Sequence, residues 1–372
     1  MINLLLCVMF PNNASPVLKS FRRHLIFLGC LCLLAPCALA EITSIAFASC
    51  IDDEKPNHPI WKALLKVNPE VAIFMGDNVY LDLSRLKTDT LTEEFNANYT
   101  KLGEIPQFKA LRSSSQILAI WDDNDYGQRD GDGSFEHKEF SKQKFLEFWD
   151  IEPRSARAER EGNFDSVWIG QGEQKIQVIL SDTRYFRSSW KRDSSATECT
   201  AGNIVPSDDE DATILGTAQW SWLEKQLSEP AAMHIFVSGI QVIPEEHCFE
   251  RWGGFPHERN RLLELLSQTE ARSIILSGDR HLAETSRLLP KEEPRINNEL
   301  IEFTSSSFTS RVGFGASETN NHRVKDDNIR VNNFGLLTLD WQNGNFTVEY
   351  LDRSGTILQK FQTVIELSDA EP

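Results

Sequence analysis

The sequence predicts an α/β protein in which helices cover the β-sheets. Short apolar runs rich in Val and Ile recur along the chain, and amphipathic helical patterns separate them. From about residue 300 onward the pattern changes to successive strands. Alternation of strands and helices is typical of chains whose sheets carry helices on their faces.

The element boundaries follow from these patterns. The predicted strands are Ile42–Ala48, Val71–Met75, Gln116–Trp121, Ile176–Leu180, His234–Ser238 and Ser273–Leu276. Helical periodicity covers residues 59–67, 136–149, 217–227 and 255–266. In the third of these helices Thr217 is the predicted N-cap, because its hydroxyl can accept a hydrogen bond from the first turn.

Further strands are predicted near the C-terminus, in the segments LIEFTSSSFT, NFGLLTLDWQ and NFTVEYLD. The last two are joined through Asn343-Gly344, a pair typical of tight hairpins. Two long polar stretches, 188–213 and 309–333, lack such patterns, and stretches of this length are often functional lids or mobile loops. Because no linker-like segment interrupts residues 41–372, we expect them to form a single domain.

Residues 1–40 differ in composition from the rest of the chain. Lys19, Arg22 and Arg23 precede the apolar stretch LIFLGCLCLLAPC, which ends in Ala-Leu-Ala before Glu41. This order is that of a secretory signal peptide cleaved after Ala40, and the apolar run is short for a membrane span. We therefore expect export to the periplasm, the cell surface or the medium, with no stable membrane span after cleavage. An uncleaved anchor is the alternative.

The net charge of −17 bears on the binding partners. A surface that coats nucleic acid needs an excess of Lys and Arg, so the sequence argues against such a surface but not against a small anionic substrate. Removal of the leader leaves Cys50, Cys199 and Cys248. In an oxidising compartment Cys199 and Cys248 can pair, which leaves Cys50 as a free thiol or a metal ligand.

Polar groups follow the predicted strands at the points where the strands leave the core. They are Cys50 after the first strand, Asp77 and Tyr80 after the second, Asp122 and Asp123 after the third, and Asp279 and His281 after the strand Ser273–Leu276. A single Asp in such a position is usually a turn residue or a helix cap. Ligands of α/β sheets, however, bind beyond the carboxyl ends of the strands, so we expect these groups to converge.

The residue types indicate a metal site. Asp77, Asp123 and Asp279 would repel one another unless a multivalent cation lay between them. A thiolate, a phenolate and an imidazole favour a transition metal, and phenolate favours a ferric centre, whereas carboxylates favour calcium, magnesium or manganese. The sequence therefore predicts two or more metal ions with Asp77 between them, an arrangement used for phosphoester hydrolysis.

A family resemblance supports this interpretation. Nine motifs occur in order: FASC, MGDNVYLD, IWDDNDYG, LSDTRYFR, LGTAQWSWLEKQL, VSGIQV, RWGGFPHERNRLLELL, LSGDRHLAE and EFTSSSFT. Together they resemble the alkaline phosphatase D family, the PhoD-like branch of the metallophosphoesterase superfamily, over about residues 43–350. The resemblance implies a four-layer α/β/β/α sandwich. It also implies ferric iron with one or two calcium ions, with manganese, magnesium or zinc as alternatives.

The resemblance assigns roles to particular residues. The implied metal ligands are Cys50, Asp77, Tyr80, Asp123, Asp279 and His281, with Asp123 preferred over Asp122. Arg184 and Arg187 match the motif DTRYFR and are expected to anchor phosphate, since guanidinium binds phosphate in a bidentate manner. Surface ion pairs are the alternative for both arginines. Trp252 is expected to wall the substrate pocket, with a structural turn as an equal alternative.

Asn124 departs from the family pattern, because members often have histidine there, in WDDHD. Asn can donate a hydrogen bond but cannot transfer a proton at neutral pH. Asn124 is therefore expected to bind the phosphoryl or leaving oxygen. Protonation of the leaving group then falls to water or another group, or activity is reduced.

The expected activity is hydrolysis of phosphate mono- or diesters by a metal-activated hydroxide. The substrate is expected to be a small phosphate ester or a phospholipid, and a phospholipid-directed phosphodiesterase is the main variant. A catalytically impaired homologue that only binds phosphate esters, and a structural exported domain, are the alternatives. We expect a monomer.

Overall fold

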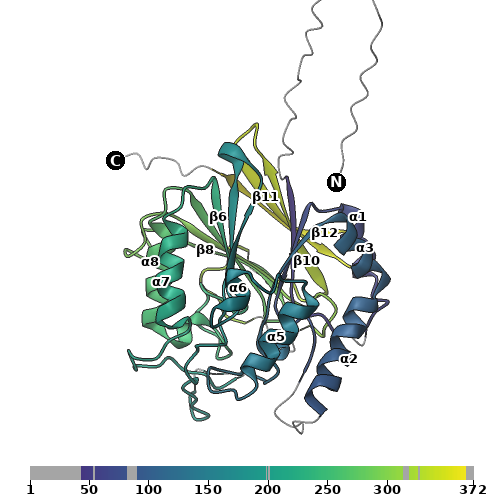
Figure 1. Ribbon diagram of the computed structural model, residues 1–372. Helices are drawn as coiled ribbons and strands as arrows, with labels where there is room; N and C mark the ends of the chain where they lie inside the picture. The colour runs from purple at the N-terminus through teal and green to yellow at the C-terminus, as the bar shows by residue number, and fades with distance from the viewer. Residues whose placement is uncertain are drawn as a thin grey trace, which may run out of the picture. The chain divides into compact units, whose positions relative to one another are not determined.

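The computed structural model describes residues 43–52, 55–81, 90–197, 199, 202–312, 318–325 and 327–365, and within them the strands form two six-stranded sheets (Figure 1). The first sheet has the order β12-β11-β10-β1-β2-β3. Its strands are β1 (Ser44–Ala48), β2 (Val71–Met75), β3 (Gln116–Ile120), β10 (Asn333–Asp340), β11 (Asn345–Asp352) and β12 (Ile357–Val364). Strands β1, β2 and β3 are parallel, and β10 joins β1 in an antiparallel direction.

The second sheet has the order β4-β5-β6-β7-β9-β8. Its strands are β4 (Asp165–Ile169), β5 (Ile176–Leu180), β6 (Met233–Ser238), β7 (Arg272–Ser277), β8 (Ala283–Leu288) and β9 (Leu300–Ser305). The four central strands run parallel. At the two edges β4 pairs antiparallel with β5, and β8 pairs antiparallel with β9. The carboxyl ends of β5, β6, β7 and β9 therefore lie along one rim of this sheet.

Alternating side chains of each strand enter different layers, as the two-residue period of a strand requires. In β1, Ile45 and Phe47 face the second sheet, whereas Ala46 and Ala48 face the helices. The layer between the sheets is apolar and includes Val178, Ile235 and Ile274 opposite Ile73. Burial of both faces explains why these strands are almost continuously apolar in sequence.

Helices cover the outer face of each sheet (Figure 1). The first sheet is covered by α1 (Ile60–Val67), α2 (Leu91–Glu104), α3 (Pro106–Ser114) and α5 (Lys138–Phe148), and the second by α7 (Gly216–Leu227) and α8 (Pro256–Ser267). Short turns form α4 (Asp123–Tyr126), α6 (Ala156–Glu159), η3 (Gly172–Gln174) and η4 (Trp252–Gly254). The order helix, sheet, sheet, helix confirms the predicted four-layer α/β/β/α class.

Details of the elements differ from the prediction. Helices α2 and α3 and the edge strands β4, β8 and β12 were not predicted, because their polar residues obscure the periodicity. The predicted N-cap Thr217 is wrong, since α7 begins at Gly216 with Leu215 as the capping residue. Instead the hydroxyl of Thr213 accepts a hydrogen bond from the Gly216 amide at 2.8 Å.

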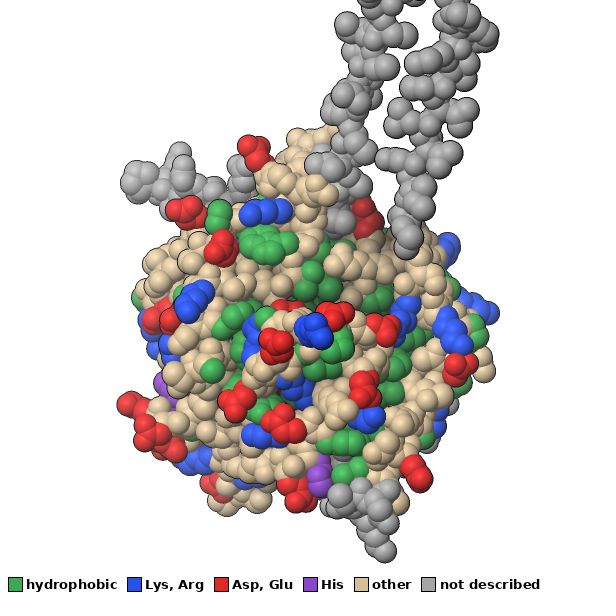
Figure 2. Space-filling view, in the orientation of Figure 1, with side chains coloured by type: hydrophobic (Ala, Val, Ile, Leu, Met, Phe, Trp, Pro, Cys, Tyr) green, Lys and Arg blue, Asp and Glu red, His purple; other side chains and the backbone are tan. Residues whose placement is uncertain are grey.

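The predicted signal peptide, residues 1–40, lies outside the described residues. Among the helices that the structure describes, none combines the length and apolar character needed to cross a bilayer. On the face shown in Figure 2, acidic and basic side chains are interspersed.

Candidate metal centre

The predicted metal ligands converge where the strands end. Cys50 follows β1, Asp77 and Tyr80 follow β2, and Asp123 begins α4 after β3, all on the first sheet. Asp279 and His281 follow β7 on the second sheet. Because the two sheets pack face to face with an apolar layer between them, the carboxyl ends of their strands can open onto one site.

Cys50, Asp77 and His281 form a first group, in which one ligand atom from each lies within 4.8 Å of the others. The Cys50 Sγ lies 3.5 Å from Asp77 Oδ2. The Tyr80 hydroxyl lies 3.2 Å from His281 Nε2, so the phenol belongs to the same group. One sulfur, one nitrogen and two oxygen donors therefore lie close together.

Asp77, Asp122 and Asp123 form a second group, in which one carboxylate oxygen from each again lies within 4.8 Å of the others. Asp77 belongs to both groups, which is the position predicted for a carboxylate between two metals. Asp279 lines the cavity onto which both groups open. Asn124 also lines it, and its side-chain Nδ2 donates to Asp123 Oδ1 at 2.9 Å while its backbone N–H donates to Asp77 Oδ1 at 3.3 Å.

The backbone at these positions is unusual. Cys50, Asp77, Asp279 and His281 have φ values of 63°, 53°, 66° and 53°, in the left-handed region that non-glycine residues seldom adopt. Each such residue costs of order 1–3 kcal/mol, and such residues cluster at functional sites. The fold therefore brings these four side chains together at the expense of local backbone energy, and three of them, Asp77, Asp279 and His281, line the cavity.

Glycines before the aspartates permit close approach of the strands. A Cβ at Gly76 would lie 2.5 Å from Asp122 Cβ, and Gly76 has φ 95°. A Cβ at Gly278 would lie 2.6 Å from Ser49 Oγ, on the other sheet. At Gly76-Asp77 and Gly278-Asp279 the strand ends are therefore too close together for a side chain on the first residue of the pair.

Ser306 is a site residue that the sequence analysis did not identify. Its hydroxyl lies 3.0 Å from Cys50 Sγ and accepts a hydrogen bond from the His281 amide at 2.8 Å. Having accepted that bond, the hydroxyl can donate its own proton to the sulfur. Ser306 lies in the motif EFTSSSFT, where three successive serines gave no signal that one of them differs from the others.

Electrostatics favours a cation at this site. Burial, followed by the charges of Cys50 and Asp123, raises the pKa of Asp77 well above its usual value. Burial also raises the pKa of Asp279 to about 6, although Arg280 opposes the shift, and raises the pKa of the Cys50 thiol to about 11. Burial lowers the pKa of His281, so its imidazole is held in the neutral form that metals bind.

The donors present fit metal ions. Asp122 Oδ2 is buried without a hydrogen-bond partner in the described part of the chain, although it lies among carboxylates. A buried unpaired carboxylate oxygen is costly, and a cation removes that cost. The thiol, phenol and imidazole suit a transition metal, and the carboxylates suit a hard divalent cation.

Comparison with known proteins identifies the family. The model of the PhoD-like phosphatases matches residues 45–350. This chain belongs to the PhoD-like phosphatase family. The family is one of phosphoesterases, so the candidate ligand groups lie in a phosphoesterase fold.

Comparison with solved structures shows that the PhoD fold is shared. A structure of PhoD is 17% identical, with a TM-score of 0.69, and the match covers 89% of this chain and 71% of that one. A putative 5'-nucleotidase from Staphylococcus aureus is 10% identical over 87% of this chain and 55% of its own, with a TM-score of 0.39. No curated protein matches the sequence.

In this PhoD-like phosphatase neither of the predicted phosphate anchors lines the cavity. Arg184 is fully buried, and its Nε donates to Asp122 Oδ1 at 2.7 Å while its Nη1 lies 2.6 Å from Glu250 Oε1. Arg187 donates to the carbonyl oxygens of Asp130 and Gly131 at 2.7 and 2.6 Å. Both guanidinium groups are occupied by internal partners, which does not favour phosphate anchoring.

Trp252 does not line the cavity either. It is fully buried in the core outside the second sheet, where it packs against Trp220 and Phe236. Its indole N–H donates to Ser238 Oγ at 3.0 Å. The surroundings of Trp252 therefore match a structural role and not a place in the wall of the substrate pocket.

Glu250 is a further acidic residue that the sequence did not single out. It lines the cavity, and with Asp123 and Asp130 it forms a third group whose ligand atoms lie within 4.8 Å. Burial opposes its ionisation, but Arg184 and Arg187 outweigh burial and lower the pKa of Glu250 to about 2. Glu250 is therefore held as a negatively charged carboxylate beside Asp123 and Asp130.

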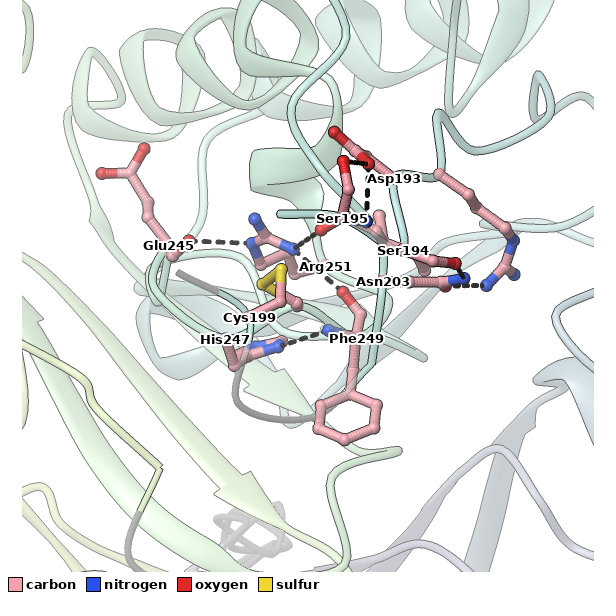
Figure 3. The surroundings of a disulfide bond; sticks show 12 residues. Asp193, Ser194, Ser195, Cys199, Asn203, Glu245, His247, Phe249 and Arg251 are labelled. Carbon is pink, nitrogen blue, oxygen red and sulfur yellow. Dashed lines mark hydrogen bonds between the residues drawn. A yellow bond between two sulfur atoms is a disulfide. The ribbon is translucent and has the colours of Figure 1, made fainter. Parts of the chain in front are cut away.

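A disulfide between Cys199 and Cys248 fixes the wall beside Glu250, and it is the pairing that the sequence left open (Figure 3). Cys50 is the remaining cysteine of the described chain and is a buried free thiol. Arg251 joins the same two loops, because its Nη1 donates to the Ile204 carbonyl oxygen at 3.3 Å. Within its own loop it donates to the carbonyl oxygens of Glu245 and Phe249 at 2.9 and 3.1 Å (Figure 3). The polar stretch 188–213 thus contributes a wall of the cavity, including Asn203.

Metal binding is expected to release protons, because the Cys50 thiol, with a pKa of about 11, and the Tyr80 phenol are protonated at pH 7 and must ionise to ligate. Metal affinity should therefore rise with pH. Calorimetric titration of metal-free protein in buffers of different ionisation enthalpy measures the number released, and we expect more than one proton per metal at pH 7. The Cys50→Ser variant should release fewer, and binding without proton release would contradict the assigned ligands.

Proposed function

We propose that this protein is an exported, metal-dependent hydrolase of phosphate mono- or diesters. The observation that carries the proposal is the convergence of the two ligand groups on Asp77 at the floor of one polar cavity of about 750 Å³. In the proposal Cys50, Asp77, Tyr80 and His281 hold a transition metal, for which ferric iron is the best match. Asp77, Asp123 and Asp279 hold a harder ion, for which calcium is the best match.

Bound metals supply a lowered pKa for water and positive charge opposite the phosphoryl oxygens. The protein's own groups position the reactants. The bond from Asn124 Nδ2 to Asp123 Oδ1 fixes the orientation of that carboxylate and leaves the amide at the cavity surface. Since an amide cannot transfer a proton at neutral pH, the leaving group is expected to take its proton from water.

The cavity lining bears on the substrate. Its lining includes three arginines and six acidic residues, whereas the only large apolar side chains among the described lining residues are Ile204 and Phe249 and the ring of Tyr80. A site for acyl chains needs extended apolar surface. The lining therefore favours a polar phosphate ester over the phospholipid variant.

The decisive test combines composition with turnover. Protein purified without chelators should contain iron and calcium by elemental analysis. It should hydrolyse 4-nitrophenyl phosphate or bis(4-nitrophenyl) phosphate, and chelation should abolish the activity. Metal without turnover would support the binding homologue in which Asn124 marks lost catalysis, and neither metal nor turnover would leave a structural domain. Sequencing the N-terminus of the mature protein tests cleavage after Ala40.

A further inference from the structure

Three arginines line the cavity: Arg129, Arg192 and Arg280. Arg192 forms an ion pair with Asp130 at 2.5 Å and donates to Asn203 Oδ1 at 2.8 Å. Arg280 pairs with Glu318 and lies over the Phe249 ring with its guanidinium carbon 3.8 Å from the centroid. Arg129 is exposed and, within the described residues, makes no ion pair or side-chain hydrogen bond.

The backbone on both sides of Arg129 is hydrogen-bonded to Asp123, one of the candidate metal ligands. The Gln128 amide donates to the Asp123 carbonyl at 3.2 Å, and the Asp130 amide donates to the Asp123 carboxylate at 2.8 Å. The Asp130 carbonyl accepts from Arg187 Nη2 at 2.7 Å. Both neighbours of Arg129 are therefore fixed relative to Asp123, while its own side chain is free at the cavity wall.

This arrangement suits an incoming anion. Arg192 and Arg280 are already neutralised by carboxylates, so among the described cavity residues only Arg129 can bind an anionic group without first breaking an internal ion pair. The reacting phosphoryl group belongs at the floor, beside Asp77 and Asp123, whereas Arg129 is exposed. A guanidinium in this exposed position can contact the part of the substrate that extends away from the reacting phosphoryl group. It binds carboxylate or phosphate through paired N–H groups.

We propose that Arg129 selects substrates that carry a second anionic group, a carboxylate or a further phosphate, on the alcohol portion of the phosphate ester. The inference rests on the proposed function and adds a substrate class to it. In a chain with a net charge of −17, the positive charge of Arg129 at the cavity also offsets the general repulsion of such substrates.

Two phosphonates of matched shape test the inference, because their carbon–phosphorus bond resists hydrolysis. 3-Phosphonopropionate carries a second anion, and propylphosphonate replaces that carboxylate with a methyl group. Calorimetry on the metal-loaded protein should show 3-phosphonopropionate binding about five- to tenfold more tightly, the range of a charge-assisted contact that is partly exposed. Arg129→Gln should abolish this preference, and Arg129→Lys should retain part of it. Raising the salt concentration should weaken the preference in wild type.

Arg154→Gln is the matched control, since Arg154 is also exposed and lies outside the cavity lining; it should leave the preference unchanged. If Arg129→Gln weakens both phosphonates equally, Arg129 serves the reacting group and the inference is overturned. If it weakens neither, Arg129 is a solvated surface residue and the inference is again overturned. Turnover of bis(4-nitrophenyl) phosphate separates the two proposals: its absence, with the preference intact, defeats the hydrolase function alone.

Discussion

Replacing Asp77 with asparagine should remove both bound metals and reduce kcat/KM by more than about 100-fold. Mutation of residues that only contact a metal ligand already lowers metal affinity or activity roughly 10- to 100-fold. Asp77 is the only described residue shared by the Cys50–His281 group and the Asp122–Asp123 group. Elemental analysis and steady-state kinetics on the same preparation give the two readouts.

The metal-free form of Asp77→Asn should be at least as stable as metal-free wild type. Burial and the neighbouring charges raise the pKa of Asp77, so the folded metal-free protein holds this proton more tightly than the unfolded chain does. Stability is then lost as pH rises from the unfolded pKa through the folded one, and asparagine removes that loss. Urea denaturation at pH 7.5 with a chelator measures it.

Asp150→Asn is a matched control for this variant. Asp150 has the same φ of 53° as Asp77, and its side chain is 79% exposed and far less constrained. Asparagine tolerates this backbone region well, so neither variant introduces backbone strain. Asp150→Asn should keep its metals and its activity. Full metal content in Asp77→Asn would refute the assignment of Asp77 as the shared ligand.

Replacing Arg184 with methionine should lower the free energy of unfolding by about 3–5 kcal/mol, the usual cost of breaking a buried ion pair from one side. Arg184 compensates two buried carboxylates, those of Asp122 and Glu250. Its loss leaves both charges in the interior. Denaturant titration of metal-free protein measures the change, and the additional change Glu250→Gln should recover part of it.

The exposed pair of Arg295 and Glu293 provides the control, since the Arg295 side chain is 50% exposed. Arg295→Met should cost less than about 1 kcal/mol, as exposed ion pairs generally do. Arg184→Met also distinguishes the two roles considered for this residue. A phosphate anchor would keep its stability and show a raised KM instead, and that result would contradict the structural role.

Much of the fold was predictable because burial leaves a local mark. Strands β1, β2 and β5 are buried on both faces, so their apolar runs appear directly in the sequence. The edge strand β4 has one exposed face and mixed composition, so no run marks it. The same reason hides α2, whose exposed face is rich in polar residues.

The candidate ligands could be predicted because each lies directly after a strand, and the carboxyl end of a strand is where side chains reach a site. Glu250 and Ser306 gave no such signal. Glu250 lies in a loop and is held at the site by ion pairs with Arg184 and Arg187, which are 66 and 63 positions away along the chain. Ser306 enters through hydrogen bonds to Cys50 and His281.

By itself the sequence determined the α/β class, the family resemblance and the set of donors at the strand ends, because residue type and strand period are local properties. Only the tertiary structure decided which charges are already neutralised. Arg184, Arg187 and Arg129 are the same residue type, but the first two are enclosed by carboxylates and carbonyl oxygens and the third is not. Ion pairing depends on distances between segments remote in the chain, and no local pattern encodes them.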